Sequence, residues 1–167
     1  MTSEQISLNA RASRTKTTFR MEYAVATNIQ APSKAIWALL TNAGDFPRWN
    51  STIKSIDGNI KPGEKIKLCA TIAPERTFNL AIKEFVPEKK MVWGDGMAPM
   101  FTGVRTFTLI PQADGSTDFR MAEVFSGLML PMIAGSLPDF RETFERYAAD
   151  LKSEAERISG SDEWEAV

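Results

Sequence analysis

The chain has 167 residues, and 43% of them are hydrophobic, which is enough to form the core of one ordinary domain. Its 20 basic and 21 acidic side chains give a formal net charge of -1, which offers no positive field to a nucleic-acid backbone. The chain has no histidine and one cysteine, Cys69. These counts exclude an internal disulfide, most zinc sites and the histidine-dependent nucleophile systems, and they favour a reducing cytoplasm.

The two ends of the chain are predicted to be tails. Residues 1–17 are polar and lack the apolar segment of a secretory signal, so we expect a disordered N-terminal tail. Residues 159–167 are predicted as a flexible C-terminal tail. Between them, residues 18–158 contain no internal repeat or linker and are predicted as one domain. Apolar runs there fall well short of the ~20 residues of a membrane span.

The first part of this domain combines a strand with two short helices. Residues 18–30 are rich in β-branched and aromatic side chains, which predicts a strand. Pro32 suits the first turn of a helix, and Ile36, Leu39 and Leu40 give that helix an apolar face. Residues 45–49 predict a second helical turn.

From residue 51 onward almost every segment has the pattern of a strand. The predicted strands are 52–60, 64–73, 77–86, 90–94, 102–111 and 117–126, separated by short Pro- and Gly-containing turns. No gap between them is long enough for a crossover helix, so the strands are predicted to be antiparallel.

A long amphipathic helix is predicted to follow. Apolar side chains recur at the spacing of one helix face: Leu137, Phe140, Phe144, Tyr147 and Leu151. Pro131 and Pro138 indicate that the helix begins near residue 130 and kinks, or that a short separate helix precedes it.

The predicted fold class is therefore α+β: a seven-stranded, curved antiparallel sheet wrapped around a long C-terminal helix. The element order is one strand, two short helices, six strands and the long helix. Because a curled sheet need not fill the space around one helix, this geometry predicts an internal cavity.

Strand alternation predicts which side chains line that cavity. In the last hairpin, pairing Phe107 with Met121 keeps the large apolar side chains on one face and places Arg105 opposite Glu123. The predicted ligand-binding residues are Trp49, Ile66, Leu68, Leu80, Ile82, Trp93, Arg105, Phe107, Met121, Glu123, Phe125, Leu137, Phe140 and Phe144.

Arg105 and Glu123 are the most distinctive polar residues on the predicted inner face. Opposite charges there must pair or reach water, because isolated burial is costly. Three interpretations stay open: a polar anchor that orients a ligand, a purely structural ion pair, or two side chains that point outward to solvent.

Several motifs resemble one protein superfamily. Ile29-Gln30-Ala31-Pro32, Ile36-Trp37 and Asp45-Phe46-Pro47-Arg48-Trp49-Asn50 are similar to the opening of the START-related, birch-pollen-allergen-like (SRPBCC) superfamily. The segments 102–109 and 125–128 resemble its polyketide-cyclase and lipid-transport branch. The resemblance spans about residues 19–158 and implies the helix-grip fold. It also implies three kinds of function: lipid or hormone binding, aromatic polyketide cyclisation, and chaperone-cofactor work.

Three functions are compatible with these observations. The first is a non-catalytic carrier or sensor that binds a small hydrophobic, lipid- or polyketide-like molecule in the cavity. The second is a cyclase- or dehydratase-type enzyme, in which Arg105 and Glu123 would be the catalytic residues. The third is a protein-interaction module. We expect no cofactor or metal, no nucleic-acid partner, and a monomer or weak homodimer.

Overall fold

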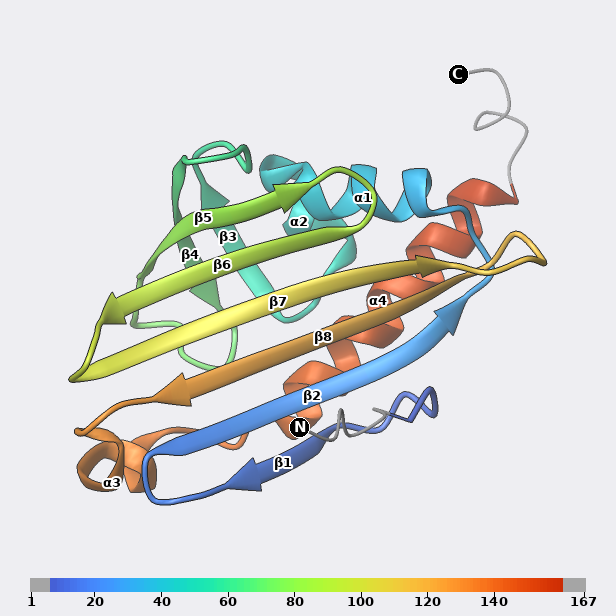
Figure 1. Cartoon of the computed structure of the whole chain (residues 1–167). Helices are drawn as coiled ribbons and strands as arrows, with labels where there is room; N and C mark the ends of the chain where they lie inside the picture. Colours follow the sequence, from blue (N-terminus) through green and yellow to red (C-terminus); the bar gives the residue numbers. More distant parts are fainter. Residues whose placement is uncertain (1–6, 161–167) are drawn as a thin grey trace.

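The computed structural model describes residues 7–160 and contains, within that range, one eight-stranded antiparallel sheet (Figure 1). Its strands follow the order β1-β2-β8-β7-β6-β5-β4-β3. They are β1 (Ser13–Lys16), β2 (Arg20–Ile29), β3 (Ile53–Asp57), β4 (Lys65–Ala70), β5 (Phe78–Val86), β6 (Lys90–Met97), β7 (Phe101–Pro111) and β8 (Thr117–Ser126). The α+β class and the antiparallel sheet packed against a long C-terminal helix are confirmed.

Within the described residues, the helices occur at two places in the chain, between β2 and β3 and after β8. Between β2 and β3 the chain forms α1 (Ser33–Thr41), η1 (Ala43–Asp45) and α2 (Phe46–Trp49). After β8 come α3 (Leu130–Ile133), η2 (Ala134–Ser136) and the long helix α4 (Arg141–Ser159). Figure 1 shows α4 lying across the sheet behind β7, β8 and β2. Between residues 7 and 160, no helix is long and apolar enough to cross a membrane.

The sheet has one strand more than the seven predicted. The additional strand, β1, lies inside the segment predicted as a disordered tail and pairs antiparallel with β2, with Ser13 opposite Ala24. All four of its residues are exposed. Main-chain hydrogen bonds therefore hold this edge strand, and its polar side chains give no alternation from which it could be predicted. The remaining tail positions 1–6 and 161–167 lie outside the described residues.

The long helix begins later than the apolar stripe predicted. Leu137 has an extended backbone, with φ -76° and ψ 135°, because the residue before a proline is disfavoured in the helical region. Pro138 follows it, and α4 begins only at Arg141. The alternative with a short separate helix is confirmed as α3. Leu137 and Phe140 thus belong to a connecting segment, residues 137–140, rather than to the helix.

Aromatic side chains fill the space between α4 and the sheet. Tyr147 is 1% exposed, and its ring lies parallel to that of Phe119 on β8, with 6.5 Å between centroids. It also contacts Phe107 on β7, at 6.1 Å. Phe144 and Leu151 are fully buried on the same helix face. These rings fill the space between the sheet and this part of the helix.

An ion-pair network ties α4 to α2. The Glu154 carboxylate accepts hydrogen bonds from Arg157 Nε and Nη2 at 3.0 and 2.8 Å. Arg48 of α2 reaches the same carboxylate, with Nη1 2.7 Å from Oε1. The hydrogen bonds from Arg157, with those from Arg48, outweigh the effect of burial and lower the pKa of Glu154 from 4.5 to about 2. The carboxylate is 10% exposed, so its charge depends on these partners.

Substitution of Glu154 should reduce stability in a pH-dependent way. Because the folded-state pKa lies below the unfolded value, the stabilisation is complete above about pH 5 and is lost as the pH falls toward 2. We expect Glu154→Gln to lower the free energy of unfolding by about 2 kcal/mol at pH 7, measured by urea denaturation.

The matched control is Glu142→Gln, which breaks an exposed pair with Arg146 on the same helix. Exposed pairs contribute only about 0–1 kcal/mol, so this variant should stay close to the parent. If the difference in free energy of unfolding between Glu154→Gln and the parent is the same at pH 3 as at pH 7, the lowered pKa of Glu154 is contradicted.

Candidate ligand-binding site

The register of the β7–β8 hairpin is the one that alternation predicts. Phe107 lies opposite Met121, Leu109 opposite Phe119, and Arg105 opposite Glu123. The neighbouring strands continue the same inner face, since Trp93 on β6 is opposite both Arg105 and Ile82. Five consecutive strands, β4 to β8, therefore present one continuous inner face.

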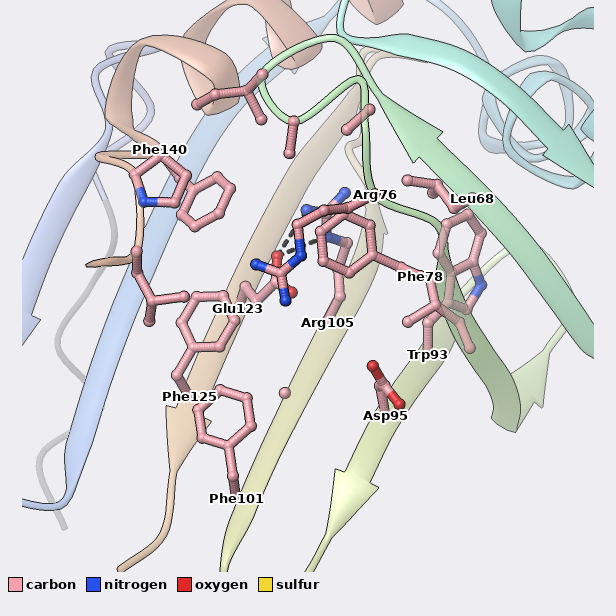
Figure 2. Close-up of a pocket in the computed structure, with 17 residues that line it drawn as sticks. Leu68, Arg76, Phe78, Trp93, Asp95, Phe101, Arg105, Glu123, Phe125 and Phe140 are labelled. Carbon is pink, nitrogen blue, oxygen red and sulfur yellow. Dashed lines mark hydrogen bonds and ion pairs between the residues drawn. The ribbon is translucent and has the colours of Figure 1, made fainter. Parts of the chain in front are cut away.

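A pocket of about 150 Å³ lies at one end of this face (Figure 2). Strands β4 to β8 form its floor, and the β4–β5 connection and segment 137–140 form its walls. A cavity of this volume lined by apolar side chains can hold a benzene-sized molecule. The lining residues are Leu68, Ala70, Ile72, Ala73, Arg76, Phe78, Leu80, Trp93, Asp95, Phe101, Gly103, Arg105, Glu123, Phe125, Leu137, Pro138 and Phe140.

The Arg105–Glu123 pair forms part of the lining of the pocket. Arg105 donates from Nε and Nη2 to the same oxygen, Glu123 Oε2, at 3.0 and 2.6 Å. Each side chain is 16% exposed, so the interpretation in which both point outward to solvent is wrong. The Arg105 guanidinium also lies over the ring of Phe144, with 5.2 Å from Cζ to the ring centroid. The pair therefore separates the aromatic core from the pocket.

Tyr147 lies next to this pair but not in the pocket. Its ring centroid is 5.9 Å from Arg105 Cζ, and its hydroxyl has no hydrogen-bond partner among residues 7–160. Burial raises the pKa of the Tyr147 phenol, and the nearby Arg105 charge opposes that shift only in part. The phenol therefore stays protonated near neutral pH and is out of reach of a molecule in the pocket.

Three stacked rings form an aromatic wall of the pocket. Phe101 on β7 and Phe125 on β8 lie 6.0 Å apart with an interplanar angle of 10°. Phe140 of segment 137–140 continues the stack, 5.7 Å from Phe125 at an angle of 28°. Figure 2 shows Phe101 and Phe125 on the side of the pocket away from Trp93. Such a wall suits a flat apolar ligand.

Eight of the residues predicted to bind a ligand line this pocket: Leu68, Leu80, Trp93, Arg105, Glu123, Phe125, Leu137 and Phe140. The other six are buried in the core instead: Trp49, Ile66, Ile82, Phe107, Met121 and Phe144. Alternation identifies the inner face correctly but does not show where that face is already covered. Tyr147 contacts two of these six, with its ring centroid 6.1 Å from that of Phe107 and 6.3 Å from that of Trp49.

Sequence reasoning missed several lining residues. Phe101 and Gly103 share a face with Arg105 on β7, and Asp95 shares one with Trp93 on β6, so a longer alternation pattern would have found them. Arg76 lies in the connection between β4 and β5, where no periodicity exists. Within the described chain, no cluster of three or more acidic or cysteine side chains is arranged to hold a metal ion.

A glycine allows two loops to meet near the pocket. Gly127 has φ +131°, and a Cβ there would collide with the carbonyl oxygen of Met100. The β8–α3 loop consequently joins the β6–β7 turn, with Leu128 N donating to Pro99 O at 3.0 Å. Figure 1 shows both loops at the same end of the sheet. Apolar side chains remain exposed there: Met97, Met100, Leu128, Met129 and Met132.

The burial of the ion pair predicts a specific mutational pattern. Arg105→Met alone leaves the Glu123 carboxylate without its partner, so we expect the free energy of unfolding to fall by about 3 kcal/mol. The double variant Arg105→Met with Glu123→Gln should recover much of that loss, because no lone charge remains. Urea denaturation of the parent and both variants measures this, and equal stability of all three would contradict a buried pair.

Solved structures share this fold at low sequence identity. A START superfamily protein from Mycobacterium smegmatis has a TM-score of 0.61 at 18% identity, with 82% of this chain and 98% of that chain covered. A conserved protein of unknown function from Enterococcus faecalis gives 0.62 at 16% identity, covering 90% of this chain and 80% of the other. CalU16 from Micromonospora echinospora has a TM-score of 0.58 at 13% identity, with 93% of this chain and 89% of that chain covered.

These likenesses confirm the START-like helix-grip fold that the sequence motifs implied. A comparison with curated proteins gave no match. The family model described as activator of Hsp90 ATPase homolog 1-like protein matches residues 30–156, which is more than half of the chain. The matched range begins at the end of β2 and includes nearly all of α4, so it contains every residue that lines the pocket. The chain belongs to the activator of Hsp90 ATPase homolog 1-like family.

Proposed function

We propose that this protein binds a small hydrophobic molecule in the pocket between β4–β8 and segment 137–140, as a non-catalytic carrier or sensor. The observation that carries the proposal is a largely apolar, partly aromatic pocket whose lining contains an internally neutralised ion pair. Pockets of this composition are the usual sites for small organic ligands, with a few polar groups that fix orientation.

The dimensions of the pocket support a compact ligand. A volume of about 150 Å³ suits one aromatic ring or a short alkyl chain. Arg76 and Asp95 at the border of the pocket are exposed, so a longer molecule can extend from the pocket into solvent. The stacked rings of Phe101, Phe125 and Phe140 would contact the apolar part of such a ligand.

The arrangement favours binding over the cyclase or dehydratase alternative. Among the residues that line the pocket, the carboxylates are Asp95 and Glu123, and Glu123 is neutralised by Arg105. General acid–base catalysis is most efficient when the catalytic group has a pKa near the working pH. Tyr147 is excluded from the pocket and has a raised pKa, so it does not supply that group.

The family description names an activator of the Hsp90 ATPase, which corresponds to the third alternative, a protein-interaction module. A docking module has no need of a ligand-sized internal cavity. The pocket therefore supports small-molecule binding over this alternative.

A pocket-blocking experiment tests the proposal. We expect 1-decanol and 4-phenyl-1-butanol to raise the melting temperature of the parent by an amount that grows with the logarithm of their excess over Kd. Ala70→Phe and Leu137→Trp each place a ring in the pocket and should weaken binding by about tenfold or more. Leu137 lies in a connecting segment, which tolerates substitution better than a strand does.

The control is Lys67→Phe, which adds the same ring to the exposed face of β4, opposite the pocket. It should bind both probes as the parent does. If neither probe shifts the melting temperature, or if both blocking variants bind like the parent, the pocket is not the binding site.

A further inference from the structure

We infer that the ligand of this pocket is an amphipathic monocarboxylate whose carboxylate binds Arg76. The inference rests on the proposed function and adds to it the chemical class of the ligand. Its basis is that, among the charged side chains that line the pocket, Arg76 has no hydrogen-bond or ion-pair partner within residues 7–160.

Four charged side chains line the pocket: Arg76, Asp95, Arg105 and Glu123. Two of them, Arg105 and Glu123, neutralise each other through two hydrogen bonds to one carboxylate oxygen. Asp95 has a local donor, since its Oδ1 accepts the Gly96 backbone N–H at 2.7 Å. These three groups therefore have partners within the protein.

Arg76 is the exception. It is exposed at the border of the pocket, and within residues 7–160 its guanidinium makes no ion pair or hydrogen bond. Its side-chain contact is with the ring of Phe78, which lies 5.4 Å from Cζ. Figure 2 shows the Arg76 side chain extending across the pocket, in this view in front of Glu123.

The position of Arg76 is defined by its surroundings. Its backbone N–H donates to Ala73 O at 3.1 Å, in the turn that leads into β5. The ring of Phe78 supports the guanidinium by a cation–π contact. A guanidinium held over a ring keeps its in-plane N–H donors available, because the contact uses only its face.

The complementary ligand group is a planar anion. A guanidinium has five N–H donors and no acceptor, and a carboxylate matches its fork with two parallel hydrogen bonds. The apolar part of the same molecule would lie against Phe101, Phe125 and Phe140. A second carboxylate on the ligand would face Asp95 or Glu123, which disfavours dicarboxylates. Arylalkanoates and medium-chain fatty acids meet these requirements.

The test compares an acid with the alcohol of the same skeleton. The probes are 4-phenylbutyrate and 4-phenyl-1-butanol, titrated at pH 7 by calorimetry. We expect the parent to bind the acid about two- to fivefold more tightly, because an ion pair with an exposed arginine contributes up to about 1 kcal/mol. Arg76→Gln should remove this preference while changing the affinity for the alcohol by less than about twofold. Raising the salt concentration should weaken binding of the acid alone.

Arg146→Gln is the matched control, since it removes an exposed arginine charge from α4 outside the pocket. It should keep the preference for the acid. Equal affinity of the parent for acid and alcohol would overturn the inference. An equal loss of affinity for the acid and the alcohol in Arg76→Gln would also overturn it, because that result indicates lost packing rather than a lost charge.

The two proposals fail in different ways. If the alcohol binds and Ala70→Phe blocks it, but the acid has no advantage, the pocket binds ligands and only the role of Arg76 is wrong. If neither probe binds the parent, the proposed function itself is wrong.

Discussion

The packing of one tyrosine ring determines where this fold can hold a ligand. Tyr147 on α4 lies against Phe107 and Phe119 of the sheet and is almost completely buried. Helix and sheet are thus in direct aromatic contact along the body of α4. These rings occupy the space between the helix and the sheet in this region. The unfilled volume lies beyond the helix, where Pro138 delays its start to Arg141 and the chain runs as an irregular segment instead.

The Arg105–Glu123 pair stands at the boundary between these two regions. On one side, the guanidinium covers the rings of Phe144 and Tyr147. On the other, the pair forms part of the pocket wall. Pairing with the partner directly opposite in the adjacent strand offsets part of the cost of burying each charge. The lining consequently contains a neutralised ion pair, and Arg76, on the connection between β4 and β5, is the lining arginine without a hydrogen-bond or ion-pair partner within residues 7–160.

The sequence was informative where side-chain alternation reports a buried face. The register of β7 and β8, including Arg105 opposite Glu123, follows from the rule that a one-residue slip would mix the two faces. The same reasoning fails for β1, whose residues are all exposed and whose pairing depends on the main chain. It also fails for Phe107, because alternation cannot tell a filled part of the inner face from an open one. That distinction depends on which rings the facing helix supplies. Arg76 was missed because it lies in a turn, where no periodic pattern exists.

The most direct measurement is a crystal structure of the protein soaked with 4-phenylbutyrate. The account predicts electron density for the phenyl ring against Phe101, Phe125 and Phe140, with the carboxylate at Arg76 and the Arg105–Glu123 pair intact. Density for the ligand between α4 and the sheet, with Tyr147 displaced from Phe119, would contradict it. So would a pocket closed by Leu137 and Phe140 with the ligand bound elsewhere.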